Sequence, residues 1–419
     1  MVTERRQVLV IGGGPAGIMA ALSAAERGAA VTLWERNRSL GRKLAITGKG
    51  RCNITNHTTN EELVRHIPGN GAFLYSAFSR FSAEDTINFF EQQCGLPLKT
   101  ERGRRVFPVS DRAQDVVDAL RRQLEAAGVQ LCFERRAQSL LFSGDAVSGA
   151  VDTAGRCTMA DAVIVACGGV TYPATGSTGD GYALAEQAGH TIVSPRGSLV
   201  PLETMEDWPA ELSGLTLKNV SLHVYDGEKL LDSAFGEMLF AHFGVTGPIV
   251  LSLSKTVCAQ EEQGKWLTLS LDLKPALTAE QLDARLQRNF IKFSRKHFGN
   301  SLAELLPASL IPVFIRLSGI AADKPSNQLT RVERQRIGGL LKDLPLTVKG
   351  PRPLAEAIVT AGGVCTREVE PRSMQSRCRK QLYFAGEVLD VDGFTGGYNL
   401  QAAWSSGFVA GMMAAGASS

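Results

Sequence analysis

The sequence predicts an α/β fold in which a mostly parallel sheet is interrupted by a β-rich insertion that carries a small helical part. Three observations support this fold. An apolar run enters a glycine-rich turn at residues 8–17, and comparable transitions recur at residues 161–169 and 382–387. After Pro195 the pattern changes to alternating apolar and polar residues, which is typical of half-exposed antiparallel strands.

Residues 8–17 and the run that follows carry a dinucleotide-binding fingerprint. Gly12, Gly14 and Gly17 have GxGxxG spacing between an apolar run and a helical pattern, and Glu35 ends the next apolar run. Gly12 permits a tight turn, Gly14 lets the backbone approach a pyrophosphate, and Gly17 lets the helix pack on the strand. Glu35 would accept hydrogen bonds from the adenosine ribose hydroxyls. The candidate contacts are Gly12, Gly14, Pro15, Ala16, Gly17 and Glu35.

A glycine-rich basic loop follows Glu35. Three glycines and four basic residues lie between positions 41 and 51. We interpret this as a loop around a phosphate-bearing ligand, because glycine allows close approach and Arg42 or Lys43 would balance a pyrophosphate charge. The alternative is a solvated basic loop. Cys52 and Asn53 would face the reactive part of the ligand. The candidate contacts are Arg36, Arg42, Lys43, Thr47, Gly48, Gly50, Arg51, Cys52 and Asn53.

Residues 60–128 are predicted to be mostly helical. Within them, a turn carries Arg102, Arg104 and Arg105, which we interpret as a solvent-facing loop rather than a substrate clamp. Short strands are predicted at residues 129–133, 139–142 and 146–151.

Residues 161–169 contain a second strand that ends in glycine. The run is apolar on both faces, as in a buried parallel strand, and ligands bind at the carboxyl ends of such strands. Ala166, Cys167 and Gly168 are therefore candidate cofactor contacts. In the loop that follows, Tyr172 would line the site and Asp180 would cap the next helix.

The middle third is predicted to form two inserted parts. Residues 195–274 and 343–354 form a β-rich domain, and residues 275–342 form a helical subdomain. His242 lies in a loop of the β-rich part and is a candidate substrate contact, with a structural role as the alternative.

The last segment returns to the pattern of the first. A strand ends at Gly386 and Glu387, and a glycine-opened helix follows, so this segment should complete the same site. The first domain is therefore predicted to be discontinuous, formed by residues 1–194 and 355–419. The candidate contacts are Gly386, Glu387, Gly396, Gly397, Asn399 and Leu400.

Composition narrows the class of protein. The chain is 44% hydrophobic and 21% charged with a net charge of +3, which favours a globular protein without a strong field for nucleic acid or membrane. No apolar run is long enough for a transmembrane helix. The eight cysteines form no CxxC pair and the six histidines no HxH or HExxH motif, which favours a reducing cytoplasm and no metal centre.

Taken together, these motifs resemble those of the bacterial flavoproteins called NAD(FAD)-utilizing dehydrogenases. The shared motifs, besides the fingerprint, are the loop at residues 40–56, Thr171–Gly181, His242–Pro248, Thr360–Val364 and Phe384–Gln401. The family includes a 3-dehydro-bile-acid Δ4,6-reductase and proteins described as aminoacetone oxidases. The resemblance implies tightly bound FAD in a Rossmann-like domain with an inserted β-barrel-like domain and a small helical domain. It further implies that Glu387 holds the ribityl chain or a nearby phosphate.

FAD agrees with the positions of the motifs, because its two ends need both the first fingerprint and a distant segment. The helix that opens near Gly396 would point its positive end at the flavin edge that becomes anionic on reduction. A second GxGxxG with strand and helix around it is absent, so NAD(P)H would bind transiently at the flavin.

The leading functional hypothesis is an FAD-dependent oxidoreductase that reduces an activated C=C bond, such as an enone of a 3-oxo-steroid or bile acid. Hydride would pass from NAD(P)H to flavin N5 and then to the substrate, with Tyr172 or His242 as the proton donor. The partner would be a small molecule, with neither nucleic acid nor membrane. The alternatives are an amine oxidase that uses O₂, a flavoprotein that acts on RNA, and a flavin-binding protein without turnover.

Overall fold

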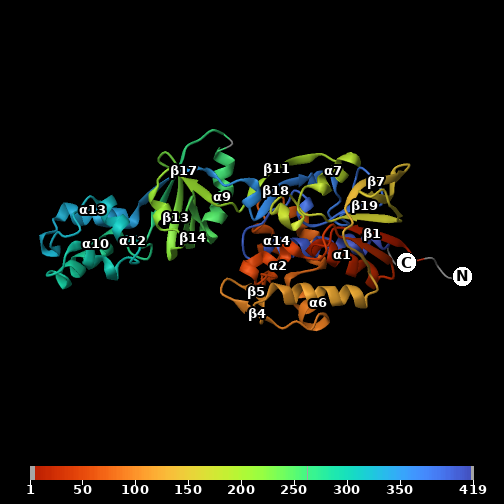
Figure 1. Cartoon of the computed structure of the whole chain (residues 1–419), viewed down its shortest axis with the longest axis horizontal. Coiled ribbons are helices and arrows are strands. Elements are labelled where there is room, and N and C mark those ends of the chain that lie inside the picture. The colour runs from red at the N-terminus through yellow and green to blue at the C-terminus, as the bar shows by residue number, and fades with distance from the viewer. Residues whose placement is uncertain (1–4, 262, 417–419) are drawn as a thin grey trace. The chain divides into compact units, whose positions relative to one another are not determined.

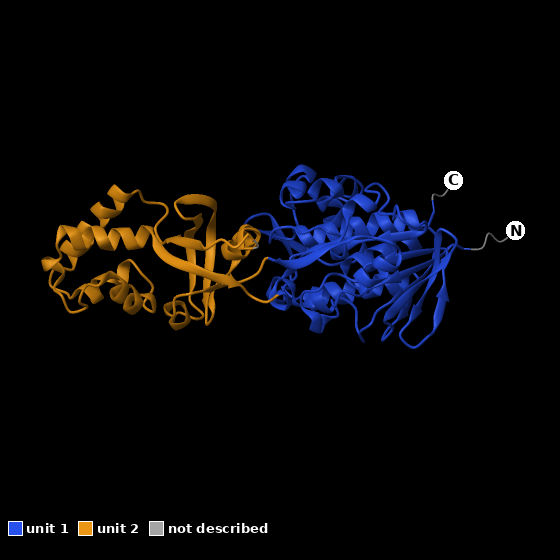
Figure 2. Ribbon diagram, turned by 90° about the horizontal axis from the view of Figure 1, so that it is seen from above, with its two compact units in different colours: residues 1–198, 354–419 blue, residues 199–353 orange. Residues whose placement is uncertain are grey.

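The computed structural model describes residues 5–261 and 263–416. They fall into two compact units, residues 1–198 with 354–419, and residues 199–353 (Figure 2). The boundary predicted after residue 194 lies inside strand β11 (Ile192–Ser198). This strand pairs with β18 (Val359–Val364), so it belongs to the first unit.

The first unit is built on a parallel sheet of five strands in the order β19-β10-β1-β2-β6. Figure 1 labels β1 and β19 of this sheet. The register pairs Val10 with Ile164, and Ile164 with Tyr383. Every residue of β10 and β19 is buried, because strands covered on both faces need continuous apolar runs. The three segments predicted to end in glycine are thus neighbours in one sheet. Their bounds are β1 Gln7–Ile11, β2 Ala30–Trp34, β6 Gln130–Cys132, β10 Ala162–Val165 and β19 Leu382–Phe384.

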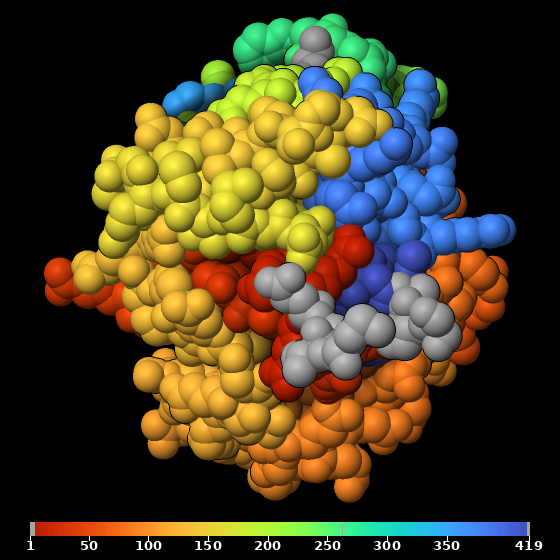
Figure 3. Space-filling model, turned by 90° about the vertical axis from the view of Figure 1, so that its right-hand side faces the viewer, coloured from red at the N-terminus to blue at the C-terminus, as the bar shows by residue number. Residues whose placement is uncertain are grey.

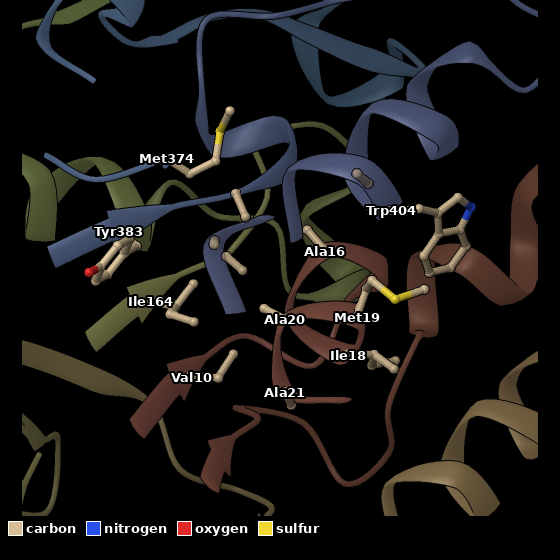
Figure 4. Packing of buried hydrophobic residues seen from close by; sticks show 14 of the residues in the cluster. Val10, Ala16, Ile18, Met19, Ala20, Ala21, Ile164, Met374, Tyr383 and Trp404 are labelled. Atoms are coloured by element: carbon tan, nitrogen blue, oxygen red, sulfur yellow. The ribbon is translucent and has the colours of Figure 1, made fainter. Parts of the chain in front are cut away.

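Helices α1 (Pro15–Glu26) and α14 (Tyr398–Ala414) pack on each other without side chains between them at two points. A Cβ on Gly407 would lie 2.2 Å from the Ala16 oxygen, and one on Gly411 would lie 2.1 Å from the Ala20 oxygen. Figure 4 shows Ala16 and Ala20 of α1 among the buried residues of a cluster that also contains Val10 and Ile164 of the sheet. The two ends of the chain therefore share one core.

Gly411→Ala should destabilise this contact by about 1–3 kcal/mol, because an added methyl group would meet rigid backbone. Thermal unfolding should show a lower midpoint. The matched control is Gly339→Ala in helix α13 (Arg331–Lys342), where a Cβ meets no atom within 4 Å and should be neutral or stabilising. Equal midpoints for wild type and Gly411→Ala would contradict the close helix contact.

The rest of the first unit surrounds the sheet. The segment predicted as mostly helical also contains a β-hairpin formed by β4 and β5. Its antiparallel register pairs Thr100 with Val106 and Glu101 with Arg105. On the face shown in Figure 3, residues from the start of the described chain lie directly beside residues from its last part. The helices are α2 Arg42–Gly50, α3 Asn60–Arg65, α4 Tyr75–Arg80, α5 Ala83–Asn88, α6 Ala113–Ala126 and α7 Asp180–Gln187. The further strands are β3 Thr55–Asn56, β4 Leu98–Glu101, β5 Arg105–Pro108, β7 Ala137–Ser143, β8 Ala146–Asp152 and β9 Cys157–Met159.

The second unit combines a closed six-stranded barrel, in the order β12-β15-β14-β13-β16-β17, with a helical part. The predicted fold class is therefore confirmed, including the barrel. One hydrophobic cluster runs through both parts, from Leu222 and Leu269 in the barrel to Leu286 and Phe314 in the helices. The strands are β12 Leu202–Thr204, β13 Thr216–Asp226, β14 Lys229–Ala241, β15 Gly244–Thr246, β16 Leu267–Asp272 and β17 Leu344–Pro351. The helices are α8 Trp208–Glu211, α9 Pro248–Glu261, α10 Ala279–Lys292, α11 Phe298–Ser301, α12 Leu310–Ser318 and α13.

Candidate functional site

The glycine turn between β1 and α1 has no room for a side chain at Gly12 or Gly17, but it has room at Gly14. Gly12 has φ +116°, and a Cβ there would lie 2.4 Å from the Ala166 oxygen. A Cβ on Gly17 would lie 1.8 Å from the Gly12 oxygen, whereas one on Gly14 would meet nothing within 4 Å. Among the described residues no side chain caps α1, which has Pro15 in its first turn, so its first N–H groups are available to an anion. The turn is thus shaped for close approach of a phosphate at Gly14.

The carboxylate of Glu35 stabilises this turn through hydrogen bonds. It is buried and accepts hydrogen bonds from the Gly13 N–H at 2.8 Å and from the backbone and side-chain nitrogens of Asn37 at 2.7 Å each. A carboxylate has about four acceptor positions. Three of them are used within the chain, which leaves about one for a ribose hydroxyl.

Arg36 and Arg42 contact the protein itself. Arg36 pairs with Asp180 at 3.1 Å, and Arg42 donates to the Asn37 side chain at 2.9 Å. Asp180 also accepts two bonds of 2.8 Å from Arg136. Burial would raise the pKa of Asp180, but the hydrogen bonds from Arg136 and Thr178 outweigh it and lower the pKa.

The prediction that Asp180 caps α7 is wrong. The helix begins at Asp180 and its N-cap residue is Gly179, which has a left-handed conformation. The Asp180 carboxylate joins the loop before α7 to Arg36 instead. Asp180 therefore positions that loop.

The basic loop is a helix with a left-handed break. Gly48 and Lys49 have φ of 57° and 59°, and the Cys52 N–H donates to the Thr47 carbonyl oxygen at 3.0 Å. Gly50 also has positive φ, of 81°. Glycine tolerates these conformations at little cost, whereas Lys49 and Cys52 are held there by the surrounding contacts.

The side chains that end this loop have three different environments. Cys52 is completely buried in the main core, and burial raises its pKa to about 12. Its side chain belongs to the main hydrophobic cluster, and a contact between Cys52 and the ligand remains a prediction. Arg51 stacks on Phe107 and pairs with Glu101 and Asp111. The Asn53 Oδ1 atom is buried and has no hydrogen-bond partner, so it is an acceptor that a ligand N–H would satisfy.

Lys43 and Glu387 join four segments at one point. The Lys43 ammonium group lies 2.8 Å and 3.0 Å from the two Glu387 oxygens and 2.8 Å from the Thr171 hydroxyl. Glu387 also accepts from the Thr360 N–H at 2.8 Å. Both charged side chains are 22% exposed. This cluster links the basic loop, the loop after β10, β18 and the segment after β19.

The segment after β10 lies against the glycine turn. The Ala166 carbonyl oxygen leaves no room for a side chain at Gly12. The Cys167 thiol donates a hydrogen bond to the Ile11 carbonyl oxygen at 3.5 Å. Burial raises the pKa of Cys167 to about 12, so its thiol is protonated. Gly168 has φ +74° and leads into the loop that contains Tyr172. Tyr172 is half-buried, has φ +52°, and follows Thr171 of the Lys43–Glu387 cluster.

Helix α14 begins without a cap. Gly396 and Gly397 have φ of 125° and 98°, and a Cβ on Gly397 would lie 2.4 Å from the Thr55 backbone. Asn399 bonds back to Gly393, and half-buried Leu400 follows it. Within the part of the chain that the structure describes, no side-chain cap bonds to the start of the helix. Its first N–H groups can therefore stabilise a partial negative charge placed before them.

Sequence reasoning missed several residues that organise the site. Asn37 bridges Glu35 and Arg42, and Asn56 donates 3.0 Å bonds to the Gly103 and Gly396 oxygens. Thr171 and Thr360 lie within motifs shared with the resembled family, so the sequence indicated that these positions matter. It did not indicate which contacts they make.

His242 belongs to the second unit and is far in sequence from the residues described above. It is exposed in the turn between β14 and β15 of the second unit, and its ring contacts Phe243 edge to face. Its role as a proton donor remains a prediction.

These features fit FAD. The open position at Gly14, the uncapped helix starts at Pro15 and Tyr398, and the unpartnered Asn53 oxygen all belong to the first unit. A pyrophosphate would lie at the first helix start, and the acceptor and donor groups at the other end suit an isoalloxazine ring. Within the described residues, no helix is both long and apolar enough to cross a membrane.

The fold and the glycine turn define a Rossmann-type dinucleotide-binding protein. The family model described as "HI0933-like protein Rossmann domain" matches residues 6–413. The chain belongs to this family, which confirms the family predicted from the sequence. It also confirms the predicted class, an FAD-dependent oxidoreductase.

Three comparisons place the chain among known proteins. It is 32% identical to the 3-dehydro-bile acid delta(4,6)-reductase of Clostridium scindens, over 97% of this chain and 98% of that protein. It is 30% identical to the ribosomal RNA dihydrouridine synthase of Escherichia coli, over 96% of each chain. The structure of the 3-ketosteroid delta1-dehydrogenase from Sterolibacterium denitrificans superposes with a TM-score of 0.54 at 13% identity, covering 98% of this chain and 99% of that one. The last comparison shows a shared fold.

Proposed function

We propose that this protein reduces a C=C bond conjugated to a carbonyl group. One observation carries the proposal: two relatives that match over almost the whole chain are named for saturating a C=C bond. In the first case the substrate is a 3-dehydro-bile acid, and in the second the product is dihydrouridine. The two substrates differ in size and charge, but in each the reducible bond is polarised by a neighbouring carbonyl group.

The residues described above would hold FAD and bias its chemistry. When bound, FAD would supply two-electron chemistry, in which a hydride from NAD(P)H is passed on to the electron-poor carbon of the substrate. The uncapped start of α14 favours the anionic reduced form by about 0.3–2 kcal/mol. Because about 1.4 kcal/mol corresponds to 30 mV for two electrons, the helix tunes the potential by only tens of millivolts.

The remaining need is a proton for the second carbon of the bond. Tyr172 is our candidate in the first unit, because it is half-buried and adjoins Thr171 of the Lys43–Glu387 cluster. Its left-handed conformation fixes the start of the 3-10 turn at Pro173–Thr175. His242 is the candidate in the second unit.

Anaerobic stopped-flow spectroscopy tests the reductase. NADH or NADPH should bleach the flavin, and an enone such as a 3-oxo-Δ4 steroid should restore its colour without oxygen. Tyr172→Phe should slow the second step about 10²-fold or more if Tyr172 is the acid, with bleaching unchanged. No bleaching by either nucleotide would contradict the reductase, and reoxidation by O₂ alone with amine turnover would favour the oxidase.

A second candidate substrate is uridine within RNA. The Escherichia coli relative favours it, and so does the exposed β4–β5 turn with Arg102, Arg104 and Arg105. Asn56 ties this turn to Gly396 at the start of α14. This candidate differs from the prediction made from composition, which is a small-molecule partner and no nucleic acid. In the structure Glu101 pairs with Arg51, and none of the three arginines has an ion-pair partner among the described residues.

One experiment distinguishes the two candidate substrates. Reduced enzyme is mixed without oxygen with either a 3-oxo-Δ4 steroid or unmodified ribosomal RNA transcribed in vitro. Flavin reoxidation and dihydrouridine formation with the RNA alone would support the second candidate. Reoxidation with the steroid alone would support the bile-acid-like substrate.

A further inference from the structure

Positive charge is concentrated in the helical part of the second unit. Residues 275–342 contain eleven Lys and Arg against five Asp and Glu, a net charge of +6, while the whole chain has +3. The remaining residues are therefore net negative. Such an uneven distribution marks a local surface for a polyanion, which the whole-chain charge conceals.

Helix α10 carries the centre of this charge as a stripe. Arg285, Arg288 and Lys292 have the spacing of one helix face, and all three are exposed. Arg295 and Lys296 are exposed in the turn that follows. The opposite face is buried in the core of the unit through Leu282, Leu286 and Phe290. The helix is thus fixed by its apolar face and presents its basic face outward.

The acidic residues nearby neutralise only part of this stripe. Asp283 pairs with Arg334 of α13 at 2.7 Å, and Glu304 pairs with Lys292 at 2.6 Å. Arg285 and Arg288 have no ion-pair partner within the described residues. Burial, and after it the charge of Arg285, lowers the pKa of Lys274. Arg285 thus acts as a positive charge on a neighbouring lysine.

A concave surface lies along the stripe. A hollow of about 750 Å³ has a lining that includes Arg285, Arg288 and Lys292, together with Asn289, Gln281 and the carboxylate of Glu304. It has room for a segment of phosphodiester backbone, and its arginines suit bidentate phosphate contacts. Beside it, Ile291 is 74% exposed, and Lys292 and Lys296 lie 5.1 Å and 4.8 Å from the centre of the Phe293 ring. Basic side chains interleaved with an aromatic ring are typical of RNA-binding surfaces.

We propose that the outer face of α10, with the turn that follows it, binds the phosphate backbone of RNA. The proposal rests on the second candidate function, reduction of uridine in RNA, and concerns backbone contacts rather than the reacting base. RNA is favoured over an anionic membrane, because membrane-surface helices insert a broad apolar face and the apolar face of α10 is buried.

The test uses the FAD-loaded protein and charge reversal. Arg285→Glu with Arg288→Glu is compared with Arg121→Glu with Arg122→Glu, an equal change of charge at exposed positions on α6. Binding of unmodified ribosomal RNA transcribed in vitro is measured between 50 and about 200 mM salt, a range over which phosphate contacts dominate affinity. FAD content and thermal unfolding are measured for each variant.

The α10 variant should bind RNA at least about tenfold more weakly, with a salt slope reduced by roughly 1.4–1.8. The α6 variant should bind like wild type, and all three proteins should keep their FAD. Equal weakening in both variants would overturn the proposal, because net charge alone would then explain binding. Failure of the wild type to bind RNA, or binding to vesicles with phosphatidylserine instead, would also overturn it. Neither outcome bears on flavin bleaching and enone reduction, which test the reductase separately.

Discussion

Gly14→Val should give folded but colourless protein. Gly14 has φ −83° and ψ −178°, which valine adopts readily before Pro15, and its Cβ would meet no protein atom within 4 Å. The side chain would instead fill the space where we expect the pyrophosphate. Loss of two charge-assisted hydrogen bonds, about 1.5–3 kcal/mol each, would weaken FAD binding by roughly 100-fold or more.

The comparison with Gly17→Ala sharpens this prediction. A Cβ at position 17 would lie 1.8 Å from the Gly12 oxygen, so this smaller substitution should damage the fold itself. Absorbance at 450 nm, circular dichroism and thermal unfolding distinguish the two. Gly14→Val should lose colour and keep its helical signal, whereas Gly17→Ala should lose both. Yellow Gly14→Val protein with normal FAD content would contradict the pyrophosphate position.

The sequence predicted the parallel sheet well because the relevant signals are local. Strands buried on both faces need continuous apolar runs, and a glycine after each run marks a close approach of backbone. Ile11 before Gly12 follows this rule, because a Cβ on Gly12 would meet the Ala166 backbone. Since parallel strands align their carboxyl ends, three such runs converge on one site, and β19, β10 and β1 are indeed adjacent.

What could not be predicted depends on contacts across the chain. Lys43 and Glu387 are 344 positions apart, so no local pattern indicates that they pair. Cys52 has φ +60°, a conformation that is uncommon for residues other than glycine, and its side chain is completely buried. Whole-chain charge likewise hides the net +6 of residues 275–342, because opposite charges elsewhere offset it.

Glu387→Gln should weaken both FAD binding and stability. The carboxylate accepts two bonds from Lys43 and one each from Thr360 and Thr171, and it is only 22% exposed. Its neutral replacement would leave the Lys43 ammonium group partly buried without a counter-charge. We expect a loss of about 1–3 kcal/mol in the free energy of unfolding and roughly tenfold weaker FAD retention.

A double-mutant cycle separates the ion pair from cofactor contact. Adding Lys43→Met to Glu387→Gln should recover part of the stability, since the unpaired charge is removed, with a coupling of about 0.5–3 kcal/mol. FAD retention should not recover if either side chain also contacts the cofactor. The matched control is Asp145→Asn, which breaks an ion pair of the same 2.8 Å length with Lys380, where the side chains are 68% and 71% exposed. Exposed pairs contribute about 0–1 kcal/mol, so this variant should behave like wild type. If the double variant regained full FAD content, the cluster would act by holding its four segments together, and the contact with the ribityl chain or phosphate would belong to other residues.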